Sequence, residues 1–348
     1  MRSKALLRVV ALTVFLCLVG CAGTTLHEIV TVPVQGGLQV QEKKTRVYAE
    51  RETIETSPNV ESVTRMTDFQ GDKDAYYPKV SPDGRWVAFA IREPESAGEE
   101  PVYNLWCVDT VGGHALRQLT DSNALNIHPA WSPDSGFIFF ASNRIGSLSH
   151  LWRIRASGGG GIMQVTSSST WDESPSVSES ATHIVFAATD PRSGEKEIWT
   201  VDSDGSFLTQ ILRGMEPAFS PDDSMVAFTL RDPKNGEVHL WKMRADGSER
   251  TQITYPEANV KGVEDRYPSW SPNGEWLAFA SDRGKDLSGR RNYDIWLVRP
   301  DGSGLTQLTT NGSHDASPTW GPNGKAIYFQ SNRGLSWDIW RMEVELPR

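Results

Sequence analysis

Cysteine is rare in this sequence of 348 residues, which contains only three. Cys17 and Cys21 lie within the first 21 residues, and Cys107 falls in an apolar strand pattern. Cys107 is the one cysteine in the body of the chain, so we expect no disulfide there, and stability has to come from a buried hydrophobic core. Cys107 is expected to be an inert buried thiol.

An excess of positive charge is also missing. The 35 lysines and arginines are outnumbered by 44 aspartates and glutamates, which gives a formal net charge of -9 at pH 7. Nucleic acids and anionic lipid surfaces are bound through basic stripes that displace counterions. We therefore expect no nucleic acid partner and no membrane contact beyond a lipid anchor.

Motifs of several enzyme classes are absent. The sequence has no Gly-x-Ser-x-Gly and no His-Glu-x-x-His, and its seven histidines show no close pairing of metal ligands. The glycine run at residues 158–161 precedes no Lys-Ser/Thr, so it does not predict a phosphate-binding loop. These absences favour a protein that is not an enzyme and has no cofactor.

The chain has no apolar run long enough for a transmembrane helix near its start. The run at residues 9–19 has eleven residues, too few to span a bilayer, and it follows three basic residues, which predicts a signal peptide over residues 1–20. Its end, Leu18-Val19-Gly20-Cys21, resembles the lipobox of bacterial lipoproteins. The resemblance implies a lipid on Cys21 and, because residue 22 is not aspartate, a periplasm-facing position on the outer membrane. An ordinary cleaved signal is the alternative.

What the sequence does contain is an internal repeat. The pattern Pro-x-aromatic-Ser-Pro-Asp/Asn-Gly, seen most clearly in residues 268–274, recurs six times at spacings of 42 to 51 residues. Equivalent positions are Pro82, Pro133, Glu179, Pro221, Pro272 and Pro322. This period is typical of propeller blades. The expected fold is therefore all-β, a single six-bladed β-propeller.

Each repeat carries four strand signals, and the sixth repeat stops after its third strand. The segment Ser62–Thr67 has the pattern of the missing fourth strand, so we expect the amino-terminal strand to close the last blade. One tryptophan per repeat, in the third strand, is expected in the core. The predicted organisation is a signal peptide (1–20), a lipidated tether with room for a short strand (21–61) and the propeller (62–348).

Four motifs recur together in these repeats: the Trp-Ser-Pro-Asp-Gly turn, Ser-Asn/Asp-Arg after the second strand, Asp-Ile-Trp, and Thr-Gln-Leu-Thr. Their combination resembles the TolB-like, or WD40-like, propellers of bacterial periplasmic proteins, over about residues 62 to 345. The resemblance implies a propeller that binds an envelope protein such as a peptidoglycan-associated lipoprotein. TolB itself carries an α/β domain before its propeller, and this sequence has a short tether instead, so contact with inner-membrane Tol proteins is not expected.

The expected function is that of a non-catalytic cell-envelope lipoprotein in a Tol-Pal-like maintenance or transport role. The alternative is a metal-dependent propeller enzyme of the lactonase or uronide-lyase type.

Binding is expected at the loops before each first strand and after each second strand, because these loops vary and surround one mouth of the channel. The candidate residues are Asp74, Asn126, His128, Asp172, Glu173, Glu216, Asp265, Arg266, His314 and Asp315. A ring of such carboxylates could hold a cation such as Ca²⁺ or a basic peptide end. The alternative is that they cap turns through hydrogen bonds to the backbone.

Overall fold

The computed structural model describes residues 24–34, 37–47, 57–69, 73–93, 101–111, 115–158, 160–256, 260–285, 289–334 and 336–347. The predicted signal peptide and Cys21 lie outside the described residues. The chain divides into two units, residues 1–49 and 50–348, which we describe separately. Within the described residues, no helix has the length and apolar character needed to cross a membrane.

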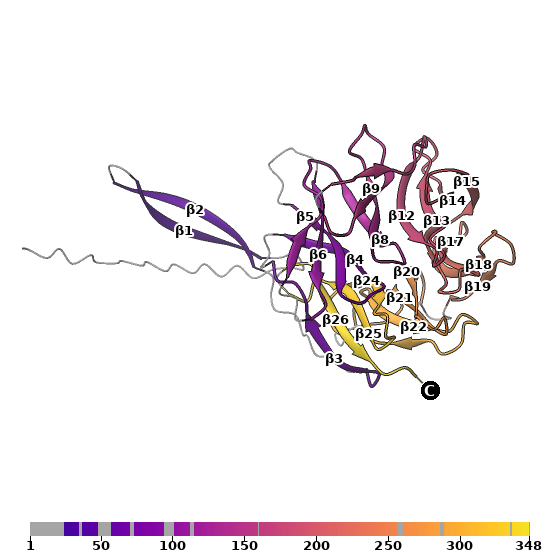
Figure 1. Cartoon of the computed structure of the whole chain (residues 1–348). Helices are drawn as coiled ribbons and strands as arrows, with labels where there is room; N and C mark the ends of the chain where they lie inside the picture. Colours follow the sequence, from indigo (N-terminus) through magenta and orange to yellow (C-terminus); the bar gives the residue numbers. More distant parts are fainter. Residues whose placement is uncertain are drawn as a thin grey trace, which may run out of the picture. The chain divides into compact units, whose positions relative to one another are not determined.

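The first unit contains a β-hairpin. Its strands β1 (Thr24–Val34) and β2 (Gly37–Val47) pair antiparallel over their whole length, from Thr24 opposite Val47 to Val34 opposite Gly37 (Figure 1). The segment predicted as a tether thus contains two strands of 11 residues each.

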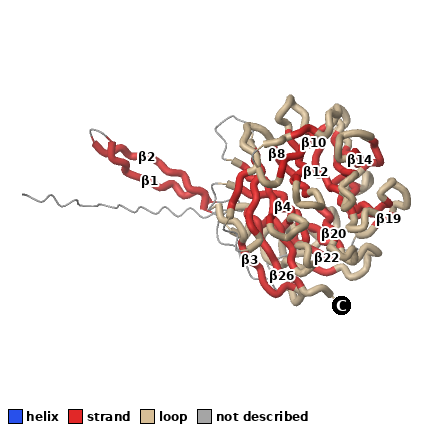
Figure 2. Tube along the Cα trace, viewed as in Figure 1, coloured by secondary structure: helices blue, strands red, loops and turns tan. Residues whose placement is uncertain are grey.

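The second unit consists of six antiparallel sheets of four strands each, and its described residues contain no helix (Figure 2). The first strands of successive sheets contact one another, and the first strand of the last sheet contacts that of the first, so the sheets form a ring. The predicted six-bladed, all-β propeller is confirmed.

The strands of each blade follow one another in sequence in the first three sheets. Blade 1 contains β4 (Asp74–Val80), β5 (Trp86–Arg92), β6 (Tyr103–Asp109) and β7 (Leu116–Gln118). Blade 2 contains β8 (Asn126–Trp131), β9 (Phe137–Ser142), β10 (His150–Arg155) and β11 (Met163–Gln164). Blade 3 contains β12 (Trp171–Val177), β13 (His183–Thr189), β14 (Lys196–Asp202) and β15 (Thr209–Arg213).

The remaining blades repeat this order, with one exception at the end. Blade 4 contains β16 (Met215–Phe219), β17 (Met225–Arg231), β18 (Val238–Arg244) and β19 (Thr251–Gln252). Blade 5 contains β20 (Asp265–Trp270), β21 (Leu277–Ser281), β22 (Asp294–Val298) and β23 (Thr306–Gln307). Blade 6 contains β24 (Asp315–Trp320), β25 (Ala326–Ser331), β26 (Asp338–Val344) and, from the other end of the propeller sequence, β3 (Val60–Arg65).

The closure of blade 6 by β3 is as predicted. β3 pairs antiparallel with β26, from Arg65 opposite Trp340 to Val60 opposite Val344. Beyond the paired segment, the amide of Met66 donates to the carbonyl oxygen of Ile339 at 2.8 Å. Hydrogen bonds within one sheet therefore join the two ends of the propeller sequence, and β26 has no unpaired edge.

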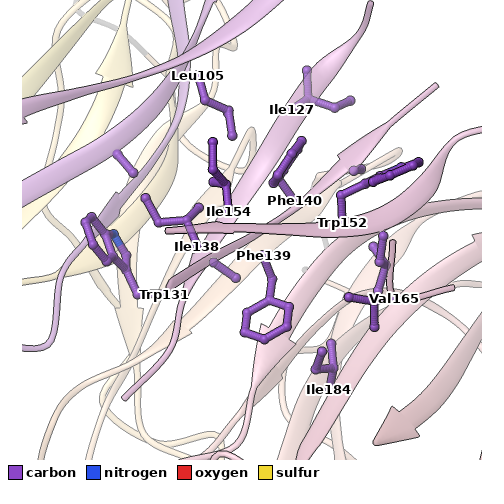
Figure 3. Packing of buried hydrophobic residues seen from close by; sticks show 14 of the residues in the cluster. Leu105, Ile127, Trp131, Ile138, Phe139, Phe140, Trp152, Ile154, Val165 and Ile184 are labelled. Carbon is purple, nitrogen blue, oxygen red and sulfur yellow. The ribbon is translucent and has the colours of Figure 1, made fainter. Parts of the chain in front are cut away.

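The hydrophobic core lies between the sheets. Every second strand contributes one fully buried phenylalanine, and these are Phe89, Phe140, Phe186, Phe228, Phe279 and Phe329. Around Phe140, side chains from neighbouring blades such as Leu105 and Ile184 join one cluster (Figure 3). The third-strand tryptophans were expected in the core; Trp152 is buried, and its five equivalents are only half-buried.

The turns between first and second strands all need a left-handed residue at one position. Gly84, Gly274 and Gly324 occupy it in three blades, whereas Ser135, Ala181 and Asp223 have φ of 58°, 58° and 60° there. Blade 3, whose turn lacks both proline and glycine, is supported by its neighbour: the Asp223 carboxylate of blade 4 accepts hydrogen bonds from the amides of Glu179 and Ser180 at 2.5 and 2.8 Å.

Replacing the exposed Ala181 by glycine is expected to stabilise the propeller by about 1 kcal/mol, because glycine adopts φ > 0 without steric cost. Thermal unfolding checks this. Asp223→Gly is the comparison: it relieves the same strain but removes the two bonds to blade 3, so we expect no gain in Tm from it. An unchanged or lowered Tm for Ala181→Gly would show that this strain is not significant.

Candidate functional site

The channel is lined by a residue that each blade places in the left-handed region. In all six first strands the pairing with the second strand shifts at the residue before the conserved proline. These residues have φ between 52° and 57° and are Tyr77, His128, Ser174, Glu216, Tyr267 and Ser317. A β-bulge of this kind turns a side chain away from the regular strand direction. Together with the prolines that follow and Lys79, they line a cavity of about 50 Å³.

Four of the predicted site residues do not face this cavity. Asn126, Asp172, Asp265 and Asp315 have no exposed surface. Asp265 accepts hydrogen bonds from Thr254 in the segment after the fourth strand and from Ser281 in the second strand, both at 2.6 Å. The expected ring of carboxylates at the channel mouth is therefore not formed by these residues, because their oxygens are bound by groups of their own blade and of the segment that leads to it from the preceding blade.

An arginine completes this arrangement in three blades. Arg144, Arg283 and Arg333, from the Ser-Asn/Asp-Arg motif, each donate to the buried residue of their own blade at 2.6 Å, namely Asn126, Asp265 and Asp315. Their guanidinium groups also lie over the third-strand tryptophans Trp152, Trp296 and Trp340, at 5.1, 5.8 and 5.2 Å from the ring centroids. The motif is therefore part of the internal structure of these three blades, where the arginine both binds the buried residue and covers the tryptophan.

The electrostatics of Asp265, in blade 5, involve His239 of the neighbouring blade 4 as well as Arg283 of its own blade. Burial alone would raise the pKa of its carboxyl group, but the hydrogen bond from His239 and the charge of Arg283 outweigh that effect and hold the pKa below its usual value. Blades 1 and 4 have Ala75 and Gly214 at this position.

Other predicted residues do meet at the channel. The Glu216 carboxylate accepts from Arg266 at 2.7 Å and from the amide of Tyr267 at 2.8 Å. Glu173 accepts from Lys196 at 2.6 Å. We call Glu173, Lys196, Glu216, Glu264 and Arg266 the ionic rim.

His128 lies in the same cavity as a neutral ring. Its ring centroid is 4.1 Å from that of Tyr77. Burial lowers the pKa of His128 to about 4, so the imidazole is uncharged at neutral pH.

Another part of the mouth is aromatic. Tyr76 lies 6.2 Å from Tyr103 and 5.7 Å from Trp337, measured between ring centroids. His314 lies 6.1 Å from Tyr293 and 6.5 Å from Trp337, and Asp74 accepts a hydrogen bond from the amide of Trp337 at 3.0 Å. We call Tyr76, Tyr103, Tyr293, His314 and Trp337 the aromatic rim; all five are partly exposed.

Sequence reasoning found His128 and Glu216 but missed Tyr77, Ser174, Tyr267 and Ser317, which occupy equivalent positions. Their common feature was visible: each precedes the conserved proline of its repeat. Lys79 was also missed. Its equivalents in the other blades are alanine, serine or threonine, so it is the one basic side chain among the described residues that line the cavity.

Burial lowers the pKa of the Lys79 ammonium to about 8, since a charged amine is disfavoured away from water. In the unfolded chain Lys79 has the ordinary lysine pKa of about 10.5, so the unfolded chain binds the proton of the ammonium more tightly than the folded protein does. The free energy of unfolding should therefore rise as the pH increases from about 8 to about 10.5. We expect Lys79→Met to be more stable than the wild type by about 3 kcal/mol at pH 7 and equal to it near pH 10.5. Chemical denaturation across this range tests the prediction; a constant difference would contradict it.

Among the residues that the structure describes, no three His, Cys, Asp or Glu side chains lie close enough together to hold one metal ion.

No family model and no curated protein matches the sequence. Solved structures do resemble the fold. TolB from Acinetobacter baumannii is 19% identical with a TM-score of 0.55, over 81% of this chain and 66% of that one. A putative TolB from Agrobacterium tumefaciens is 18% identical with a TM-score of 0.56, over 78% of this chain and 90% of that one. This chain therefore has the TolB-like propeller fold, while spanning only 66% of the Acinetobacter protein.

The fold is shared with proteins named as enzymes. An oligogalacturonate lyase from Vibrio parahaemolyticus is 16% identical with a TM-score of 0.55, over 85% of this chain and 99% of that one. At such identities the similarity shows the fold alone, and function has to be argued from the site.

Proposed function

Starting from a propeller of TolB-like fold, we propose that this protein is a non-catalytic lipoprotein of the cell envelope whose channel-mouth rim binds another protein. The observation that carries the proposal is the aromatic rim. Five partly exposed rings gather at one end of the channel, and interfaces between proteins are enriched in such rings together with arginine.

The rim is asymmetric. The aromatic rim comes mainly from blades 1, 5 and 6, and the ionic rim from blades 3, 4 and 5. The two rims adjoin at blade 5, where the Tyr293 hydroxyl donates to Glu264 at 2.9 Å. Different chemistry on neighbouring parts of the ring suits an extended partner with one apolar part and one polar part. It suits less well a small ligand centred on the axis. A peptidoglycan-associated lipoprotein is the kind of partner that the TolB resemblance implies.

The envelope location rests on the amino terminus. A signal peptide and a lipid on Cys21 would hold the propeller on the periplasmic side of the outer membrane in a Tol-Pal-like role. Replacing Cys21 by serine should then move the protein from the membrane fraction to the soluble periplasmic fraction.

Crosslinking in cells tests partner binding. The variant carries Tyr76→Ser and Trp337→Ser, which remove two neighbouring rings of the aromatic rim. We expect capture of one envelope protein by the wild type and at least about tenfold weaker capture by the variant, since loss of one interface anchor costs about 2 kcal/mol or more. Phe207→Ser is the matched control, because Phe207 is 79% exposed and lies in a hairpin between third and fourth strands, at the other end of the blades.

The outcomes separate the alternatives. Equal capture by the double variant and the control would place binding away from the aromatic rim. Capture of nothing specific, together with calcium- or manganese-dependent turnover of a lactone or uronide, would favour the enzyme of lactonase or lyase type instead. Thermal melts of all three proteins establish that the variants are folded.

A further inference from the structure

The channel cavity is lined by polar groups that have no hydrogen-bond partner among the described residues. The buried Nδ1 atom of His128 and the buried Oγ atom of Ser317 have no hydrogen-bond partner. The Lys79 ammonium forms no hydrogen bond or ion pair with any described residue. All three residues line the same cavity. Buried polar groups are normally paired, so two unpaired buried atoms beside the unpaired ammonium of the half-buried Lys79 call for a ligand that supplies the missing partner.

The charges nearby show what sign that partner should have. Three glutamates at this end of the channel are each matched by a basic residue, in the pairs Glu173–Lys196, Glu216–Arg266 and Glu264–Arg231. Lys79 is the positive charge left over. Its pKa is lowered by burial.

The unpaired groups are also suitable donors for an anion. An ammonium has three donors and no acceptor, a serine hydroxyl can donate, and a neutral imidazole donates from one ring nitrogen. A hydrogen bond to a charged oxygen is stronger than one between neutral groups. The cavity of about 50 Å³ has room for roughly three to five waters at 10–15 Å³ each, which is the size of a carboxylate group.

We propose that the channel cavity is a carboxylate-binding site in which Lys79 supplies the charge and Ser317 and His128 supply further hydrogen bonds. The site lies inside the channel and does not depend on protein binding at the rim. The carboxylate has two possible sources, a small free acid or the end of a longer chain that reaches in from the mouth.

The first experiment uses the full-length protein and sodium formate, with sodium chloride at the same concentration as the control for ionic strength. Chloride is a single atom and lacks the two oxygens of a carboxylate. Formate should raise Tm by about 2 °C or more at concentrations well above its Kd, since a ligand that binds only the folded state stabilises it. Lys79→Met should lose this response, and Lys234→Met, which changes an exposed lysine in a turn, should keep it.

A second readout follows the amine itself. In protein with ¹³C at the lysine ε-carbons, formate should raise the pKa of Lys79 from about 8, because an anion beside the ammonium favours its charged form. The other titratable or charged groups around it are Tyr77, His128, Glu173, Glu216, Arg266 and Tyr267. The signal of Lys79 is identified by its loss in Lys79→Met.

The two sources are separated by a peptide pair. Tri-alanine with a free carboxylate should act at lower concentration than formate if the natural ligand is a chain end, and its C-terminal amide should be inactive. If formate acts at the lower concentration, the ligand is a small free acid. The proposal is overturned if formate has no greater effect than chloride on Tm and on the pKa of Lys79, or if Lys79→Met responds as the wild type does. Loss of partner capture by the aromatic-rim variant leaves each of these results unaffected, so the two proposals fail separately.

Discussion

Replacing Arg283 by leucine is expected to destabilise the propeller by about 3–5 kcal/mol, which corresponds to a Tm lower by roughly 6–20 °C. Arg283 and Asp265 have side chains that are 1% and 0% exposed, and Nη2 of Arg283 lies 2.6 Å from the nearer carboxylate oxygen. Removing the guanidinium leaves the carboxylate buried without its main counter-charge. It also uncovers one face of Trp296, over which Arg283 lies at 5.8 Å.

A surface pair provides the control for this prediction. Arg244 pairs with Glu249 at 2.8 Å, and their side chains are 52% and 64% exposed. Exposed pairs contribute little, so Arg244→Leu should leave Tm close to that of the wild type. Similar losses for the two variants in urea or thermal unfolding would mean that blade 5 is not stabilised by its buried pair.

Deleting residues 57–69 is expected to have a still larger effect and to abolish cooperative unfolding of the propeller. These residues contain β3, without which β26 has no outer partner. The deletion also removes Arg65 and Thr67, which donate to the buried Asp338 carboxylate at 2.6 and 2.8 Å. Blade 6 would then contain an unpaired strand edge and a buried charge that has lost two donors.

The comparison is deletion of residues 24–47, which carries away the hairpin β1–β2 instead. Because this hairpin belongs to the other unit of the chain, the propeller should melt at the same temperature without it. Circular dichroism and calorimetry distinguish the two deletions. A normal melt for the protein lacking residues 57–69 would refute the closure of the ring by β3 as a requirement for folding.

The architecture of the propeller could be predicted because each blade corresponds to one sequence repeat with its own strand and turn signals. Turns such as Ser271-Pro272-Asn273-Gly274 set the ends of the strands, and the near-continuous apolar second strands required burial on both faces. The closure by β3 could be predicted from two features of the sequence. The sixth repeat has signals for three strands only, and Ser62–Thr67 has the pattern of a fourth strand.

The candidate site was only partly predictable. Asp172 and Asp265 looked like loop carboxylates, but each is buried by partners from other strands, such as Thr166 and Arg283. Arg283 lies 18 residues from Asp265 in the sequence, so nothing local to the loop indicated the pairing.

The channel lining depends on a backbone feature that residue patterns do not report. A bulge before each conserved proline turns Tyr77 and Ser317 inward, although regular alternation would have placed them differently. The hairpin β1–β2 was missed for a related reason. Its pairing is visible in the backbone register; in the sequence, the alternation of Val30, Val32 and Val34 with polar residues or proline before Gly36-Gly37 was the signal that could have predicted it.

The position of β3 has a mechanical consequence. It is the outermost strand of blade 6 and the first strand of the propeller along the chain, with only β26 as its neighbour in the sheet. Any tension applied through the amino-terminal segment would therefore be transmitted to β3 before it reached another blade. Under load the ring would yield there first, by detachment of a single strand, while the other five blades kept their sheets complete.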